Sequence, residues 1–153
     1  MILAKFIYLD VCVLSRPFDD QSQMRIQLET NAVNLILSHV RQNVLTLTVS
    51  PVHEAEIQAI PEQEERTQLL LLIRTLGKIS EIDLQAARKR AAYFTQQGVG
   101  IADAAHVAFV AFAEQAKADF ISVDDRLIKK CRNLSLAIWF GSPVAYCDKE
   151  NLK

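Results

Sequence analysis

The 153-residue sequence lacks the features of several common kinds of protein and site. Its three cysteines show no CxxC spacing, which argues against a zinc site or a disulfide framework and fits a reducing cytoplasm. It has only four glycines, and the absence of a glycine-rich loop and of a P-loop excludes dinucleotide-binding and P-loop folds. Residues 1–9 are too short for a signal peptide, and no apolar run is long enough to span a membrane. We therefore expect a cytoplasmic protein.

The formal net charge of −1 gives no overall basic field, so any nucleic-acid partner must be held by a local basic patch. Hydrophobic residues make up 50% of the chain and charged residues 23%, which is typical of a globular domain, and we expect one domain over residues 1–153.

The hydrophobic pattern predicts strands that alternate with helices. The expected strands are 5–9, 44–49, 119–123 and 136–140, with a short extended piece at 79–84. The expected helices are 23–42, one starting at 51, 61–76, 83–97, 102–117 and 125–132, and Ser22, Ser50 and Asp83 are expected N-caps. This alternation predicts an α/β protein with three α/β/α layers around a central, mostly parallel sheet of four to five strands.

Four acidic residues, Asp10, Glu56, Asp103 and Asp124, lie where a buried carboxylate cluster can form. Asp10 and Asp124 each follow a short apolar run, so we expect both at the carboxyl ends of strands, where parallel sheets bind ligands. A carboxylate among apolar residues is costly unless it is neutralised, and a divalent cation would neutralise it. Carboxylates alone suit Mg²⁺ or Mn²⁺, and such a cluster activates water for phosphodiester hydrolysis.

Other α/β functions fit this sequence less well. A haloacid-dehalogenase-type phosphatase needs a second Asp two residues after the first, where Cys12 stands. A phospho-accepting receiver domain needs an Asp at the end of a middle strand, but the second strand ends at Ser50-Pro51. Cys12 also has no flanking glycine, so a hydrolase nucleophile elbow is missing. A metal-dependent nuclease remains as the best of these classes.

Four motifs, in order and at suitable spacing, resemble those of the PIN-domain ribonuclease family, which includes the VapC-type toxins. They are Tyr8-Leu9-Asp10 at the first strand, Ser50 and Glu56 as a Ser-x5-Glu helix, residues 101–106 as an "ADA" helix start, and residues 121–127 as a "T-x-D" strand end. The resemblance runs through almost the whole chain. It departs from the family at Val11 and Cys12, because the family usually carries Thr, Ser or Asn just after the first Asp.

The resemblance implies a metal-dependent endoribonuclease with Asp10, Glu56, Asp103 and Asp124 as catalytic residues. Asp10, Asp103 and Asp124 are the expected ligands of Mg²⁺ or Mn²⁺, and Glu56 completes the cluster directly or through water. Glu54 competes for that role, but residues two apart on a helix point to different faces, and the motif spacing favours Glu56. The three aspartates could also be ordinary turn or helix-capping residues.

Asp125, His106 and Ser122 are candidates for residues that support the ligands. Asp125 could equally be a first-turn residue favoured by the helix dipole. His106 lies one turn after Asp103 on the same helix face, and such a histidine could also be an ordinary core residue.

Arg16, Arg126, Lys129 and Lys130 are candidate contacts to RNA phosphates, although they could equally form a solvated face. For a VapC-like toxin, we expect a small antitoxin that covers the acidic site, with an arginine. A homodimer is also expected, and the apolar faces of residues 68–76 and 105–113 could supply its interface or belong to the core. The alternative is a catalytically weak or inactive PIN-like module that binds RNA or a protein partner, which Val11 motivates.

Overall fold

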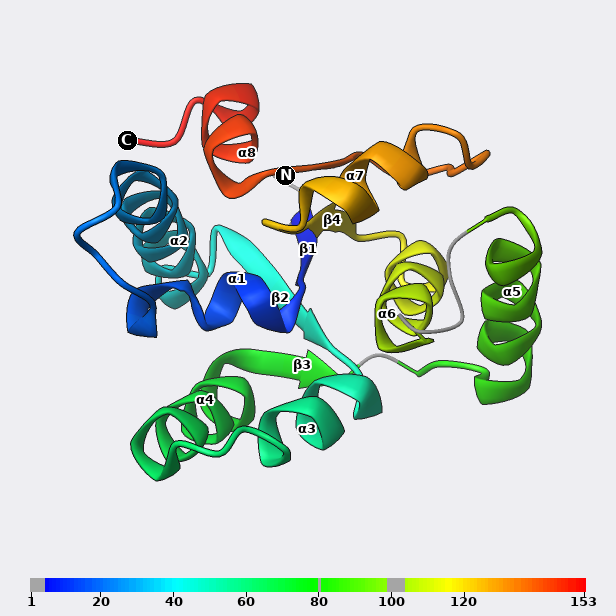
Figure 1. Cartoon of the computed structure of the whole chain (residues 1–153), viewed down its shortest axis with the longest axis horizontal. Helices are drawn as coiled ribbons and strands as arrows, with labels where there is room; N and C mark the ends of the chain where they lie inside the picture. Colours follow the sequence, from blue (N-terminus) through cyan, green and yellow to red (C-terminus); the bar gives the residue numbers. More distant parts are fainter. Residues whose placement is uncertain (1–4, 80, 99–103) are drawn as a thin grey trace.

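The computed structural model describes residues 5–79, 81–98 and 104–153, and it contains a five-stranded parallel sheet (Figure 1). The strands lie in the order β3-β2-β1-β4-β5, and all four neighbouring pairs are parallel. Helices α2 and α8 pack together on one side of the sheet, whereas α5 and α6 pack on the other. The predicted three-layer α/β/α fold with a central parallel sheet is therefore confirmed.

The strands are β1 (Lys5–Leu9), β2 (Leu45–Val49), β3 (Gly77–Ile79), β4 (Asp119–Ile121) and β5 (Phe140–Gly141). The helices are α1 (Val11–Leu14), the 3₁₀ helix η1 (Arg16–Phe18), α2 (Met24–Arg41), α3 (Pro51–Gln58), α4 (Gln63–Leu76), α5 (Leu84–Gln96), α6 (Ala104–Gln115), α7 (Asp125–Cys131) and α8 (Pro143–Glu150). No helix within the described ranges is long and apolar enough to cross a membrane.

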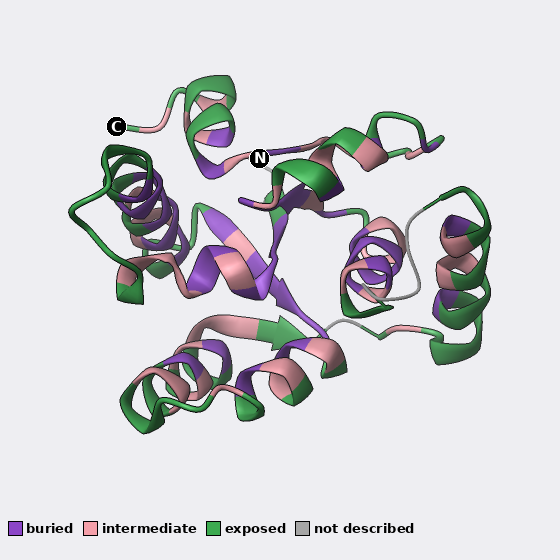
Figure 2. Cartoon of the chain, viewed as in Figure 1, coloured by how far each residue is buried: buried purple, intermediate pink, exposed green. Residues whose placement is uncertain are grey.

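Strand β1 lies at the centre of the sheet and of the core. Ile7 pairs with Leu47 of β2 and with Asp119 of β4, and Leu9 pairs with Ile121. Because these strands are parallel and covered on both faces, most of their apolar side chains are buried, although Phe6 near the start of β1 is 49% exposed (Figure 2). This register brings the carboxyl ends of β1, β2 and β4 to one edge of the sheet.

Three predicted strands differ from the observed ones. The strand expected at 119–123 is β4, which ends at Ile121. The extended piece expected at 79–84 is wrong, because the strand is β3 at Gly77–Ile79 and helix α5 already begins at Leu84. A side chain at Gly77 would clash with the Ile73 carbonyl oxygen and with Val49, so glycine allows the chain to pass from α4 directly into the sheet. The strand expected at 136–140 has only two residues in the ladder, because pairing with β4 starts near its end.

The sequence pattern missed two helices and misplaced one cap. Helix α1 has four residues, which is too short for a 3.6-residue period to show, and α8 starts at Pro143 with Ser142 accepting a hydrogen bond from the Ala145 amide. The predicted Ser22 cap is wrong, because Gln23 occupies the N-cap position of α2 and Ser22 donates to Asp20 instead. The predicted caps at Ser50 and Asp83 are confirmed.

Candidate active site

Asp10 lies at the carboxyl end of β1 and is completely buried. Its amide donates to the Ile121 carbonyl oxygen across the sheet at 3.0 Å, which extends the β1–β4 ladder by one residue. Its carboxylate oxygen Oδ2 accepts a hydrogen bond of 2.9 Å from the Ser122 hydroxyl. Its other oxygen, Oδ1, is buried and has no hydrogen-bond partner among the described residues. A buried carboxylate oxygen without a partner is costly, and a bound cation is one way to satisfy it.

Glu56 lies on α3, which begins at the carboxyl end of β2. Ser50 and Pro51 start this helix with a capping box, as the Ser-Pro pair predicts. Glu56 is half-buried, and its Oε2 is buried without a hydrogen-bond partner in the part of the chain that the structure describes. Glu54, the competing candidate, instead forms an ion pair with Arg74 on α4. Glu54 is therefore paired with α4, whereas Glu56 is the one that feels the charge of Asp10.

Asp124 and His106 meet at the same edge of the sheet. Asp124 is the N-cap of α7, and its Oδ1 accepts from the amides of Arg126 and Leu127 at 3.0 and 3.2 Å. The capping role considered for this residue is thus confirmed, and its second oxygen, Oδ2, lies 3.4 Å from Nδ1 of His106. A helix cap and a metal ligand are compatible roles, because each carboxylate oxygen can serve one of them.

Ser122 places a hydroxyl beside Asp10, although the two residues that follow Asp10 in the sequence have none. Val11 is buried and apolar, and Cys12 directs its Sγ to within 3.6 Å of the Ser122 hydroxyl. The Ser122 hydroxyl donates to Asp10 and accepts from the Asp124 amide at 3.1 Å. It therefore links two of the predicted ligands, so a hydroxyl from the residue directly after β4 lies beside Asp10 although positions 11 and 12 lack one.

Burial shifts the pKa values of Asp10 and Glu56 upward. Burial raises the pKa of Asp10, whereas His106 and hydrogen bonds from Cys12 and Ser122 lower it. Burial also raises the pKa of Glu56, the negative charge of Asp10 raises it further, and His106 lowers it. His106 acts electrostatically on both carboxylates and faces Asp124. Asp10, Glu56, Asp124 and His106 therefore lie near one another at this edge of the sheet, and we refer to them as the acidic cluster.

Asp103, the third predicted ligand, lies outside the described residues. Among the residues that are described, no three His, Cys, Asp or Glu side chains are grouped closely enough to hold a metal ion. The oxygen atoms nevertheless fit a hard divalent cation, because Asp10 Oδ1 and Glu56 Oε2 are buried acceptors that no described group satisfies. A cation bound there would neutralise the charges whose burial raises both pKa values.

The remaining predicted residues lie around this cluster. Asp125 is exposed, and both of its carboxylate oxygens accept from Arg25, at 2.7 and 2.8 Å. Arg16 is held by Glu29 and Asp19, at 2.7 and 3.1 Å.

Three predicted phosphate contacts lie on α7, directly after Asp124. Arg126 and Lys129 are exposed and Lys130 is half-buried. Within the described ranges, none of the three forms an ion pair with a carboxylate.

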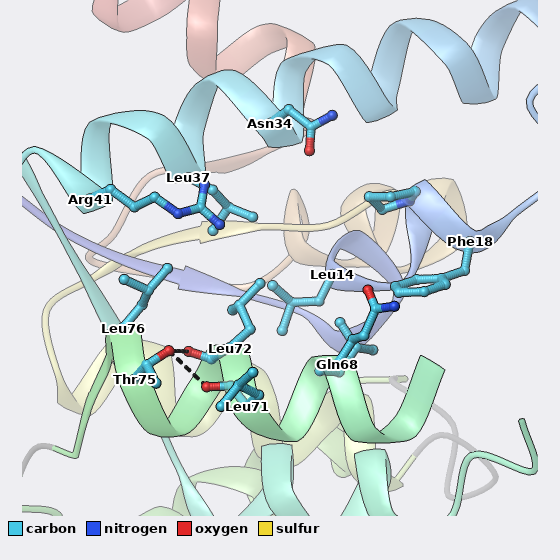
Figure 3. A pocket seen from close by; sticks show the side chains of 12 residues that line it. Leu14, Phe18, Asn34, Leu37, Arg41, Gln68, Leu71, Leu72, Thr75 and Leu76 are labelled. Atoms are coloured by element: carbon cyan, nitrogen blue, oxygen red, sulfur yellow. Dashed lines mark hydrogen bonds between the residues drawn. The ribbon is translucent and has the colours of Figure 1, made fainter. Parts of the chain in front are cut away.

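A leucine groove lies between α2 and α4 (Figure 3). Its walls include Leu37 from α2, Leu72 and Leu76 from α4, and Leu14 from α1, around a hollow of about 500 Å³. None of the acidic residues described above lines it. The groove is therefore a separate apolar surface feature and not part of the acidic cluster.

The sequence pattern gave no role to His53, which the structure places in the core beside the acidic cluster. It is completely buried, and its ring nitrogens bind backbone groups at the start of α3 and at the end of β1. A capping box normally has Glu or Gln three residues after the N-cap, so the sequence carried no standard signal for His53 in that position.

Comparisons with known proteins agree with this fold. A family model described as "PIN domain" matches residues 7–133. A solved structure of FitAB bound to the IR36 DNA fragment is similar, with a TM-score of 0.55 and 18% identity, over 90% of this chain and 95% of that one. FitAcB from Neisseria gonorrhoeae is similar with a TM-score of 0.52 and 13% identity, over 90% of this chain and 97% of that one. Comparison with curated proteins gave no match. Because the family model spans well over half of the sequence, the chain belongs to the PIN domain family.

Proposed function

We propose that this protein is a Mg²⁺- or Mn²⁺-dependent endoribonuclease that hydrolyses RNA phosphodiester bonds at the acidic cluster. The observation that carries this proposal is the pair of buried carboxylate oxygens, Asp10 Oδ1 and Glu56 Oε2, which have no hydrogen-bond partner among the described residues. Membership of the PIN domain family supports a nuclease, and the choice of RNA over DNA rests on the family resemblance.

The expected ligands of the metal are Asp10, Asp103 and Asp124. A bound divalent cation would supply an activated water and stabilise the charge that develops on the phosphate. Ser122 holds one oxygen of Asp10 and leaves the other for the cation. Glu56 orients the attacking water from α3, on the side of the site next to Asp10.

The basic residues of α7 would hold the RNA beside the acidic cluster. Arg126, Lys129 and Lys130 follow Asp124 within two turns, so a phosphate bound by them lies near the predicted ligands. Arg16 remains a candidate contact, although its guanidinium already binds Glu29. Asp125 and His106 are proposed to support the ligands, and of these two His106 has the direct contact with Asp124.

A catalytically weak or inactive PIN-like module is the second candidate function. Val11 and Cys12 favour it, because neither provides the hydroxyl or amide that the family usually has after the first aspartate. The position of Ser122 favours the active form, since its hydroxyl already binds Asp10. Binding of RNA without measurable Mn²⁺ binding at millimolar metal would support the inactive module.

Two protein partners are proposed on the family resemblance. The first is a small antitoxin that covers the acidic cluster with an arginine. The second is another copy of the chain, and here the two predicted apolar faces differ. Residues 107 and 109–113 of α6 are buried in the core, whereas Leu71 of α4 is 63% exposed beside the leucine groove. The face at 68–76 is therefore the better candidate for a dimer interface.

Cleavage of matched RNA and DNA oligonucleotides in Mg²⁺, in Mn²⁺ and in a chelator tests the proposed function. We expect RNA cleavage that requires metal and is lost in Asp103→Asn. Glu56→Gln should lose about 10²-fold or more in rate, whereas the matched variant Glu54→Gln on the same helix should stay within about twofold. Cleavage in the chelator, or full activity of Asp103→Asn, would contradict the proposal.

A further inference from the structure

A buried polar network surrounds His53, next to the acidic cluster. The Ser50 amide donates to Nδ1 of His53 at 3.0 Å, and Nε2 of His53 lies 2.7 Å from the Leu9 carbonyl oxygen. The Tyr8 hydroxyl lies 2.6 Å from the Ser50 hydroxyl. The rings of Tyr8 and Phe109 enclose the imidazole, with centroid distances of 4.6 and 5.0 Å. All of these groups are buried, so the hydrogen bonds act without competition from solvent.

These contacts allow only one protonation state of His53. Nδ1 accepts from a backbone N–H, so it carries no proton. Nε2 faces a carbonyl oxygen, which can only accept, so Nε2 carries the proton. His53 is therefore neutral in the folded protein and connects two backbone groups that are far apart in the sequence. Burial in this apolar cage lowers the pKa of His53 to about 4, which agrees with that assignment.

The network joins three elements that carry the proposed site. Leu9 immediately precedes Asp10 on β1. His53 lies one turn before Glu56 on α3, and Phe109 lies one turn after His106 on α6. A single side chain thus contacts the strand end, the helix start and the buried helix from which Asp10, Glu56 and His106 project.

We propose that His53 is a positioning residue that fixes α3 against the end of β1 and so sets the separation of the Asp10 and Glu56 carboxylates. This inference rests on the proposed function, because it takes these two carboxylates as part of a metal site. The two carboxylates repel each other, and each has an oxygen without a partner among the described residues. Without a fixed link between their backbones, α3 would relax away from Asp10 and weaken the site in the absence of metal.

The two functions of His53 can be separated by substitution. In His53→Asn, the amide oxygen reaches the position of Nδ1 and can accept from the Ser50 amide, but the side chain is too short to reach the Leu9 carbonyl. In His53→Gln, the amide nitrogen reaches the position of Nε2 and can donate to Leu9. The first variant keeps the helix cap and loses the link to β1, whereas the second keeps the link. Ile36→Ala, in the core on α2, is a control that destabilises the fold away from the site.

The test measures Mn²⁺ affinity by calorimetry on full-length variants, at a temperature where urea titration shows each to be folded. We expect His53→Asn to weaken Mn²⁺ binding at least tenfold. His53→Gln and Ile36→Ala should stay within about threefold of the wild type. Any other ranking, including an equal loss in the Asn and Gln variants, would overturn the positioning role, because a general loss of stability would not distinguish them.

A second measurement separates this inference from the proposed function. Carbon-13 spectra of the metal-free protein report the carboxyl carbons of Asp10 and Glu56 directly. We expect both signals to move in His53→Asn and to stay in place in His53→Gln and Ile36→Ala. If the wild type binds no Mn²⁺, the proposed metal site fails and these spectra alone decide the positioning role. Unchanged carboxyl signals in His53→Asn would overturn it.

Discussion

His53 should make the stability of this protein sensitive to acid. Its pKa is lowered from 6.5 to about 4, first because it is buried, while the hydrogen bond to the Leu9 carbonyl opposes that shift. In the unfolded chain the imidazole has its ordinary pKa, so between about pH 6.5 and 4 the unfolded chain binds a proton that the folded chain does not. The free energy of unfolding therefore falls as the pH falls through this window. A difference of about 2.5 pH units, at about 1.36 kcal/mol each, corresponds to about 3 kcal/mol in total.

Urea unfolding of the wild type and of His53→Gln, at several pH values from 7.5 to 4.5 in a chelator, measures this effect. Asp10 and Glu56 also titrate under acid, but their raised pKa values act in the opposite direction, because a folded state that binds protons more tightly gains stability as the pH falls. Subtracting the variant from the wild type removes their contribution. We expect the advantage of the wild type to shrink by about 2 to 3 kcal/mol between pH 7.5 and 4.5. An advantage that stays constant within about 0.5 kcal/mol would refute the buried, neutral histidine.

Three further predictions concern the acidic cluster and its surroundings. Asp10→Asn should raise the unfolding free energy of the metal-free protein by on the order of 1 kcal/mol, because it removes a buried charge. Mn²⁺ should then no longer raise the Tm of this variant. A Tm that still rises with Mn²⁺ would contradict this prediction. Ser122→Ala should lower the unfolding free energy, measured by urea titration, by about 1.5 to 3 kcal/mol, the usual contribution of a hydrogen bond to a charged group. It should also weaken Mn²⁺ binding, measured by calorimetry. Replacing Lys129 and Lys130 by alanine should raise KM for RNA and reduce its dependence on salt, with kcat little changed; an unchanged salt dependence would exclude them as phosphate contacts.

The sequence pattern predicted those parts of the fold whose signal repeats over several residues. The apolar runs at 5–9 and 44–49 and the long periodic stretch at 23–42 correspond closely to β1, β2 and α2. Helix α1 was not predictable, because four residues are stabilised by burial against the core and show no period of their own. Helix α8 was predictable in principle, since Ser142-Pro143 repeats the Ser-Pro signal that identified the start of α3.

The sheet topology allowed the location of the candidate site to be predicted, but not the contacts of its side chains. Asp10 and Asp124 meet because the carboxyl ends of parallel strands share one edge of the sheet, and that much could be predicted. The partners could not be predicted, because they depend on side-chain packing between distant segments. The hydrogen bond from Ser122 to Asp10 crosses 112 positions in the sequence, and the ion pair that holds Asp125 comes from Arg25 on α2.

The most direct test of the proposed metal site is the location of Mn²⁺ binding on the protein. Paramagnetic broadening of assigned amide signals during a Mn²⁺ titration reports this location without any assay of activity. We predict that broadening starts at residues 10, 56, 122 and 124, and that it reaches Leu71 and Thr75 beside the leucine groove only at higher Mn²⁺. Broadening centred elsewhere, or none at millimolar Mn²⁺, would contradict a metal site at Asp10 and Glu56.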